Sequence, residues 1–217
     1  MRFRRVLTAA TLAVLAAAGL SACESKVGLA ASANGHTLSH SDLSSYVQTG
    51  AQPYTDQNNQ TVVPKVYALG TWIGTQLFAD TVAKHGGPAT SGELSAARTA
   101  VLGSNSEADY QKAVAKQGYT DKFADLVLDQ SSNLVVLVQR LGKLDVTQAL
   151  SVLESGQADS ALLKAVNDTK PQVEVSSRYG EWDPTRLRMS TDPTAGVPDF
   201  VTFPTSSAPS ASETPAP

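Results

Sequence analysis

The sequence predicts a mainly α-helical domain with a small antiparallel β-sheet formed by both ends of the domain. Apolar residues recur at spacings of three and four through the middle of the chain, which is typical of helices with one buried face. At residues 27–33 and 173–175 they alternate with other residues instead, which indicates strands. Hydrophobic residues make up 41% of the 217 residues and charged residues 17%, so the chain can bury a core.

Residues 1–22 have the zones of a secretory signal peptide. Three arginines in the first five positions precede an apolar run, residues 6–20, that is too short for a comfortable membrane span. The run ends in Leu20-Ser21-Ala22-Cys23, which resembles the bacterial lipobox. Because Cys23 is the only cysteine, we expect it to carry a diacylglyceryl group, whose two acyl chains would anchor the protein stably. The alternative is an ordinary signal peptide followed by a free thiol.

Charge and composition exclude several classes of protein. Three of the 17 basic residues lie in the leader, so the chain from Cys23 onward carries 14 basic and 20 acidic residues, a net charge of −6. Nucleic-acid binding needs a basic face, which this balance does not supply. One cysteine rules out an internal disulfide framework, and three histidines leave little material for a metal centre. We therefore expect no metal, no cofactor and no nucleic acid.

The first strand, at residues 27–33, leads into a hairpin. Asn34-Gly35 is the strongest two-residue signal for such a turn, because both positions tolerate a positive φ. Residues 36–38 form the short return strand. Ser39 or Ser41 then caps a short helix.

Proline and glycine mark the segments between the helices. Residues 50–64, with Gly50, Pro53 and Pro64, form a loop, and Pro64 also suits the first turn of a helix. Gly70 and Gly74 lie four residues apart on that helix and allow close helix packing. The first predicted helix begins near Asp42, and the second runs from Pro64 to a glycine–proline stop at residues 85–88. A third begins at Thr90 or Ser91. Four more cover residues 107–117, 121–141, 146–153 and 160–166. On the helix at 121–141, Asp121, Asp125 and Asp129 form a carboxylate stripe that we expect to be solvated.

The closing strand, residues 173–175, pairs most simply with the first hairpin, because an isolated hairpin is marginally stable. An aromatic turn follows at residues 178–184, and we expect its Trp182 to pack against the helices. From Pro204 onward only Pro, Ser, Thr, Ala and one Glu remain. The predicted organisation is a signal peptide at 1–22, a lipid-anchored tether at 23–26, the helical domain at 27–184 and an extended C-terminal segment at 185–217, of low complexity from 204.

Three short stretches carry a resemblance to a known family. They are Ala31-Ser32-Ala33-Asn34-Gly35, then Thr37-Leu38-Ser39 with Asp42-Leu43, and the closing Val173-Glu174-Val175-Ser176-Ser177-Arg178-Tyr179-Gly180-Glu181-Trp182-Asp183. Together they resemble the SurA N-terminal-like chaperone domain of actinobacterial lipoproteins, which is related to the PrsA and SurA foldases. The resemblance covers residues 27–184 and implies a helical domain that binds unfolded polypeptides.

Foldases of this type insert a parvulin-type isomerase between the helices and the last strand. Here about thirty residues separate the long helix from Val173, too few for such a domain. No serine lies in a Gly-x-Ser-x-Gly nucleophile elbow either. We therefore expect a protein that is not an enzyme.

Three aromatic residues on the helix that begins at Pro64 are candidates for peptide binding. Tyr67, Trp72 and Phe78 are more than one apolar helix face can accommodate. They either line an apolar groove for a peptide or wrap round the helix into a second core layer.

These features lead to two expectations about function. The first is a membrane-anchored lipoprotein on the extracytoplasmic face of the cell membrane, with chaperone-like, non-catalytic binding of unfolded or secreted polypeptides. The second is a structural or adaptor lipoprotein that binds one cell-envelope partner. In both, the membrane is contacted through the lipid on Cys23.

Overall fold

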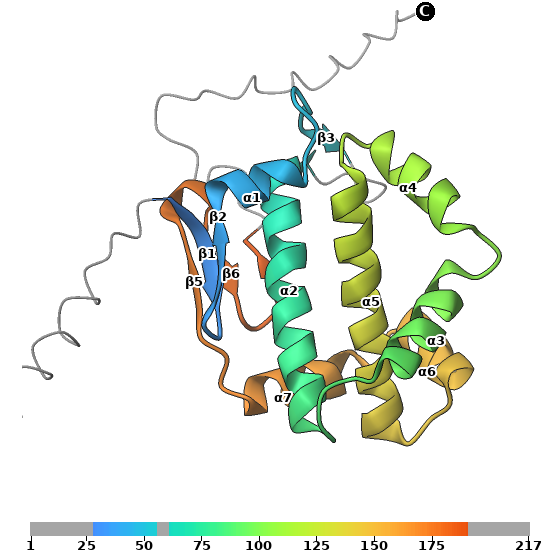
Figure 1. The fold of residues 1–217 in the computed structure, drawn as a ribbon. Helices are drawn as coiled ribbons and strands as arrows, with labels where there is room; N and C mark the ends of the chain where they lie inside the picture. The colour runs from blue at the N-terminus through green and yellow to red at the C-terminus, as the bar shows by residue number, and fades with distance from the viewer. Residues whose placement is uncertain (1–27, 56–60, 191–217) are drawn as a thin grey trace, which may run out of the picture.

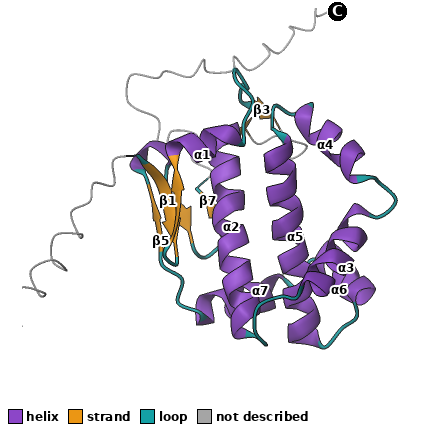
Figure 2. Cartoon of the chain, viewed as in Figure 1, coloured by secondary structure: helices purple, strands orange, loops and turns teal. Residues whose placement is uncertain are grey.

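The computed structural model describes residues 28–55 and 61–190. Within them the chain forms seven α-helices and small antiparallel sheets, which confirms the predicted fold class. The helices gather on one side of the three-stranded sheet (Figures 1 and 2). The predicted signal peptide, the tether with Cys23 and the segment from 191 onward lie outside the described residues.

The sheet joins the two ends of the domain. Strands β1 (Leu29–Ala33), β2 (His36–Ser39) and β5 (Val173–Val175) lie in the order β2-β1-β5, and both pairs are antiparallel. Asn34 and Gly35 make the turn between β1 and β2 with φ of +49° and +88°. The predicted hairpin and its pairing with the closing strand are therefore confirmed.

Two long helices form the centre of the domain. Helix α2 (Pro64–Lys84) lies between the sheet and helix α5 (Asp121–Gly142), as Figure 1 shows. Because α2 has neighbours on opposite sides, it is buried over much more than the single apolar stripe that its sequence predicts. At Gly74 a β-carbon would overlap Nε2 of Gln130 on α5, so the end of that side chain occupies the space next to the glycine.

Shorter helices surround this pair, and side chains cap several of them. Ser39 accepts a hydrogen bond from Asp42 N at 3.0 Å at the start of the first helix. Thr90 and Glu93 form a reciprocal capping box at the start of another, which settles the choice between Thr90 and Ser91. These helices are α1 (His40–Ser45), α3 (Ser91–Leu102), α4 (Glu107–Ala115), α6 (Val146–Glu154) and α7 (Asp159–Asp168).

Two short ladders and one helical turn were not expected from the sequence. Strands β3 (Tyr54–Thr55) and β4 (Thr61–Val62) pair inside the segment predicted as a loop. After β5, a 3₁₀ turn (Ser177–Tyr179) leads to strands β6 (Trp182–Asp183) and β7 (Arg188–Met189), which also pair. The buried Met189 lies against α2 at Gly70, where a β-carbon would come within 3.2 Å of Met189 Cγ. The folded part therefore continues to Ser190, past the predicted boundary at residue 184.

Candidate functional site

Strand β5 is an edge strand of the three-stranded sheet. Every second residue of the β5 segment has its backbone hydrogen bonds directed toward the neighbouring strand β1. Asn34 N donates to Gln172 O and Ser176 N donates to Ala30 O, both at 2.9 Å. In an antiparallel pair the residues between them direct N–H and C=O to the opposite side. The backbone groups of Val173 and Val175 therefore face away from the sheet, and no residue in 28–55 or 61–190 hydrogen-bonds to them.

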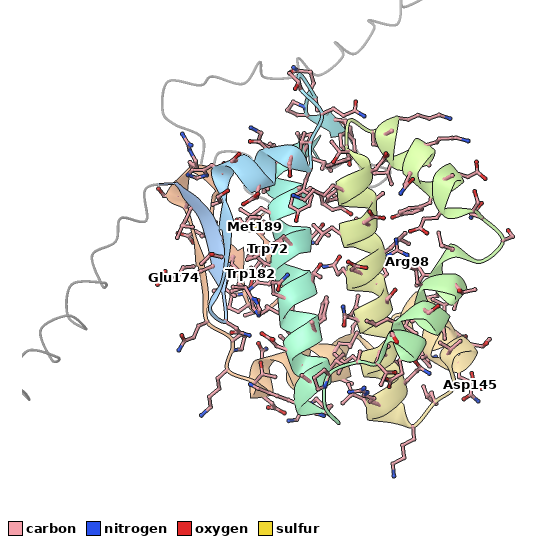
Figure 3. All side chains as sticks on the ribbon, in the orientation of Figure 1. Trp72, Arg98, Asp145, Glu174, Trp182 and Met189 are labelled. Carbon is pink, nitrogen blue, oxygen red and sulfur yellow. The ribbon has the colours of Figure 1, made fainter. Side chains whose placement is uncertain are left out.

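A pocket lies beside this edge, between β5 and β6. Its volume is about 340 Å³, at the small end of the range of about 300–1,000 Å³ that is usual for binding pockets. We name it the edge pocket; its lining residues are Pro171, Val173, Val175, Gly180, Glu181, Trp182 and Pro184. Figure 3 shows Trp182 on the inner side of the sheet, toward α2, and Glu174 on the outer side.

The two valines give the pocket an apolar wall. Val175 is paired with Ala31 and Val173 with Ala33, and both alanines are buried on the core face of the sheet. Cross-strand partners share a face, so the valine side chains also lie on that face. They are only half-buried because no further strand in the described chain covers the edge. The edge pocket is thus a continuation of the core that is open at the side.

Trp182 forms the inner wall of the edge pocket and has an unsatisfied polar atom. Its indole Nε1 is buried and finds no hydrogen-bond acceptor among the described residues. A buried donor without a partner costs about 1–3 kcal/mol. The ring is retained here for its apolar bulk, because it is paired with the buried Met189 in the neighbouring strand.

We expect Trp182→Phe to change the free energy of unfolding by less than about 1 kcal/mol, because loss of the orphan N–H offsets the smaller ring. Trp182→Ala, which removes the whole ring, should cost about 3 kcal/mol. Urea unfolding followed by circular dichroism measures both. A loss in Trp182→Phe as large as that in Trp182→Ala would mean that the indole N–H has a partner.

Two carboxylates lie at or near the rim of the edge pocket, and one of them, Asp183, is paired with Arg186 at 3.7 Å. Glu181 is exposed and lines the pocket, and its carbonyl oxygen accepts a hydrogen bond from Ser190 N at 2.8 Å. Asp183 follows in the β6–β7 turn and accepts from Thr185 Oγ1 at 2.6 Å and from Thr185 N at 2.8 Å. The hydroxyl bond from Thr185 holds the pKa of Asp183 below its usual range. The site therefore combines an apolar wall formed by the two valines, their outward backbone groups and one acidic lining residue, Glu181.

The three aromatic residues predicted for peptide binding do not share one surface. Trp72 and Phe78 are buried in the core, so for them the second alternative, a core layer around α2, is correct. Tyr67 is 49% exposed and contacts the rings of Tyr119 and Phe123, with centroid distances of 6.0 and 5.8 Å. None of the three lines the edge pocket.

The acidic stripe on α5 is only partly solvated. Arg98 of α3 donates to Asp125 and Asp129 at 3.0 Å each and also pairs with Glu107 of α4. Burial, which outweighs the attraction of Arg98, raises the pKa of Asp129. Two of the three stripe carboxylates therefore join α5 to α3, and Arg98 also joins α3 to α4 through Glu107. In the described part of the chain, no group of three or more His, Cys, Asp or Glu side chains could hold a metal ion.

The β6–β7 hairpin, which carries Trp182 and Pro184 of the edge pocket, escaped the sequence analysis because two-residue strands show no periodicity. The signal that was available is the Asp183-Pro184-Thr185 turn, in which an aspartate accepts from the backbone two residues later. Comparison of the chain with protein-family models, with curated proteins and with solved structures finds no match. None of the described helices has the length and apolar character needed to cross a membrane.

Proposed function

We propose that this protein is a lipid-anchored extracytoplasmic protein that binds an extended polypeptide segment along the edge of β5, without covalent chemistry. The observation that carries the proposal is the exposed edge of β5 with the edge pocket directly beside it. The resemblance to chaperone-domain lipoproteins, which rests on the sequence alone, points in the same direction.

The geometry suits the addition of a strand. A bound segment can pair with the outward N–H and C=O groups of Val173 and Val175, which supplies affinity independent of sequence. Every second side chain of the segment then points to the core face of the sheet, where the edge pocket can take a large apolar group. This combination favours unfolded or newly secreted chains, which still expose apolar side chains and unpaired backbone.

The expected anchor would hold this site close to the membrane. Four residues, 24–27, separate Cys23 from Gly28, where the described structure begins, and an extended chain of this length spans at most about 14 Å. Strand β1 starts at Leu29 and is the direct neighbour of β5. A lipid on Cys23 would therefore hold the β5 edge near the membrane surface.

We expect Val175→Pro to weaken the binding of a reduced, carboxymethylated and therefore permanently unfolded polypeptide by about tenfold, because proline removes one outward N–H without touching the ladder to β1. Val175→Thr keeps the N–H and the β-branched shape and serves as the matched control. Fluorescence anisotropy of the labelled polypeptide measures both. Equal affinity in the two variants, with both shown to be folded by circular dichroism, would mean that the β5 edge is not the binding site.

A second candidate function is the adaptor that binds one envelope partner. The observation in its favour is that Tyr67 and Leu141, at 49% and 37% exposed, are the exposed large hydrophobic residues of the described chain. A chaperone with many clients usually presents a larger apolar surface. Crosslinking through a photoreactive group at Glu181 separates the two functions: one stoichiometric product indicates an adaptor, and a broad set of products indicates a chaperone.

We expect Cys23→Ala to abolish labelling by a fatty-acid analogue and to release the protein from the membrane fraction, since the proposed diacylglyceryl group needs the thiol. Cell fractionation with immunodetection measures the distribution. Ser25→Ala, two residues away, is the matched control and should stay with the membranes. Retention of Cys23→Ala in the membrane fraction would contradict the lipid anchor.

A further inference from the structure

Glu174 ends a row of cross-strand partners on the outer face of the three-stranded sheet. Thr37 of β2 pairs with Ser32 of β1, and Ser32 pairs with Glu174 of β5. Figure 3 shows Glu174 on this outer side, where its side chain is exposed. Threonine and serine are uncharged, so the row has one charged member, and that member lies at the open edge.

A strand added beside β5 extends this row by one residue. The backbone groups of Val173 and Val175 face the added strand, whereas those of Glu174 are directed toward β1. Antiparallel pairing therefore makes the position opposite Glu174 a non-hydrogen-bonded pair, in which the two Cα atoms are about 4.5 Å apart and the side chains are closest. Opposite charges stabilise such a pair and like charges destabilise it. The carboxylate of Glu174 thus favours a basic residue there.

The residues on either side of that basic position have a different environment. Because side chains alternate between the two faces of a strand, the neighbours of the basic residue point to the core face of the sheet. There Val173, Val175 and Trp182 line the edge pocket. The favoured segment therefore has an apolar residue next to its basic one.

The next charges along the chain confine the preference to this one position. Lys170 precedes β5 and Arg178 follows it, and both side chains are exposed. A segment that is basic throughout would bring like charges together beyond both ends of β5. One central basic residue avoids this repulsion and still lies opposite Glu174.

We propose that the β5 edge selects an extended segment with one lysine or arginine opposite Glu174 and an apolar residue next to it, directed to the edge pocket. This inference rests on the proposed function, because it uses the same edge, and it adds the chemical class of the segment that is bound. Backbone pairing with Val173 and Val175 supplies the affinity that all segments share. Glu174 sets the preference among them through its charge.

A second copy of this chain is a poor occupant of the edge for the same reason. Two copies that pair antiparallel through all the outward groups of β5 set Val173 of one against Val175 of the other. That register places Glu174 directly opposite Glu174, and like charges at such a position are unfavourable. The carboxylate that favours a basic segment therefore also opposes self-association, as charged residues do on other edge strands.

The test uses three labelled peptides of the sequence Gly-Thr-Ile-Xaa-Val-Thr-Gly, in which Xaa is lysine, glutamine or glutamate. Fluorescence anisotropy with the full native chain measures their affinities. The lysine peptide should bind about fivefold more tightly than the glutamate peptide, with the glutamine peptide between them, as expected for one exposed cross-strand charge pair. The three affinities should converge in about 1 M salt, because salt screens exposed charges. Equal affinities at low salt, or no binding of any of the three, would overturn the proposal.

Charge reversal at Glu174 shows whether this residue sets the order. In Glu174→Lys the glutamate peptide should bind most tightly, and in Glu174→Gln the three affinities should lie within about twofold of one another. Glu154→Lys, at the exposed end of α6, is the matched control and should keep the native order. Circular dichroism checks that each variant is folded. The native order in Glu174→Lys and Glu174→Gln would overturn the proposal.

Val175→Pro separates this inference from the proposed function. If it weakens the unfolded polypeptide while the native chain does not distinguish the three peptides, the edge is the binding site and only the selection by charge fails. If it weakens neither the peptides nor the unfolded polypeptide, the proposed function fails as well. Size-exclusion chromatography tests the remaining occupant: a native dimer that Val175→Pro dissociates would assign the edge to a second copy and overturn the proposal.

Discussion

Replacement of Tyr119 by alanine should lower the free energy of unfolding by about 4 kcal/mol, as expected for the loss of a fully buried aromatic ring. Tyr119 is completely buried and stacks on Phe123 with ring centroids 4.3 Å apart. Its backbone carbonyl also accepts from Gln48 Nε2 at 2.8 Å, which joins the segment after α1 to the start of α5. The cavity left by alanine would separate these elements. Chemical denaturation followed by circular dichroism gives the free energy.

Tyr119→Phe is the control that separates the ring from its hydroxyl group. Burial, together with the hydrogen bond to Tyr54, raises the pKa of Tyr119, so the hydroxyl stays neutral. The two hydroxyl oxygens are 3.3 Å apart, which is long for an O–H···O bond, so its loss should cost no more than about 1 kcal/mol. A small loss in Tyr119→Ala, similar to that in Tyr119→Phe, would contradict the packing described here.

Replacement of Arg140 by methionine should cost about 2 kcal/mol, because it leaves partly buried acceptors without a donor. The guanidinium group, 15% exposed, comes from the last turn of α5. It donates to Val82 O at 2.9 Å, to Gly87 O at 2.5 Å and to both carboxylate oxygens of Glu93 at 3.0 and 3.1 Å. One side chain therefore ties the end of α2 and the start of α3 to α5.

Arg140→Lys keeps the charge but lacks the planar fork, and it should lose about half as much stability. The pH dependence gives an independent check. The backbone N–H of Thr90, followed by the Arg140 side chain and the Thr90 hydroxyl, lowers the pKa of Glu93 from 4.5 to about 2. The stabilising contribution of this carboxylate is complete above pH 4.5 and is lost as the pH falls toward 2. Unfolding curves between pH 6 and 2 should decline less steeply for Arg140→Met than for the native chain; identical slopes would contradict the assigned role of Arg140.

The sequence was informative where local rules decide the structure. The Asn34-Gly35 turn, the helix start at Thr90 or Ser91 and the helix start at Pro64 are each set by neighbours within a few residues, and all three are confirmed. The pairing of β5 with β1 was also predicted, because a lone hairpin needs a third strand.

The extent of burial on α2 could not be predicted from composition. Thr75 and Thr81 are polar residues, yet both are buried. Their burial is possible because their hydroxyl groups donate to Thr71 O and Leu77 O one turn earlier, at 2.8 and 2.7 Å. A threonine satisfied within its own helix behaves as an apolar residue toward its neighbours. Trp72 and Phe78 could accordingly enter the core on more than one face of the helix.

The candidate site depends on contacts between distant segments. The sequence located Val173, Val175 and Trp182, but it did not reveal that β5 lies at the edge of the sheet or that a pocket separates it from β6. Those properties arise from the strand order, which has no local signal, and from the short β6–β7 ladder, whose only local signal is its Asp183-Pro184-Thr185 turn. The same holds for Arg98 and Arg140, whose partners lie in other helices.

The central claim, that β5 is the binding edge, is tested most directly by mapping a bound polypeptide with two-dimensional nuclear magnetic resonance. The ¹⁵N-labelled chain would be titrated with the unlabelled, reduced and carboxymethylated polypeptide. The account predicts the largest shift changes at the amides of Val173 and Val175 and at the indole N–H of Trp182. Changes confined to Tyr67 and its neighbours on α2, with β5 unaffected, would contradict it.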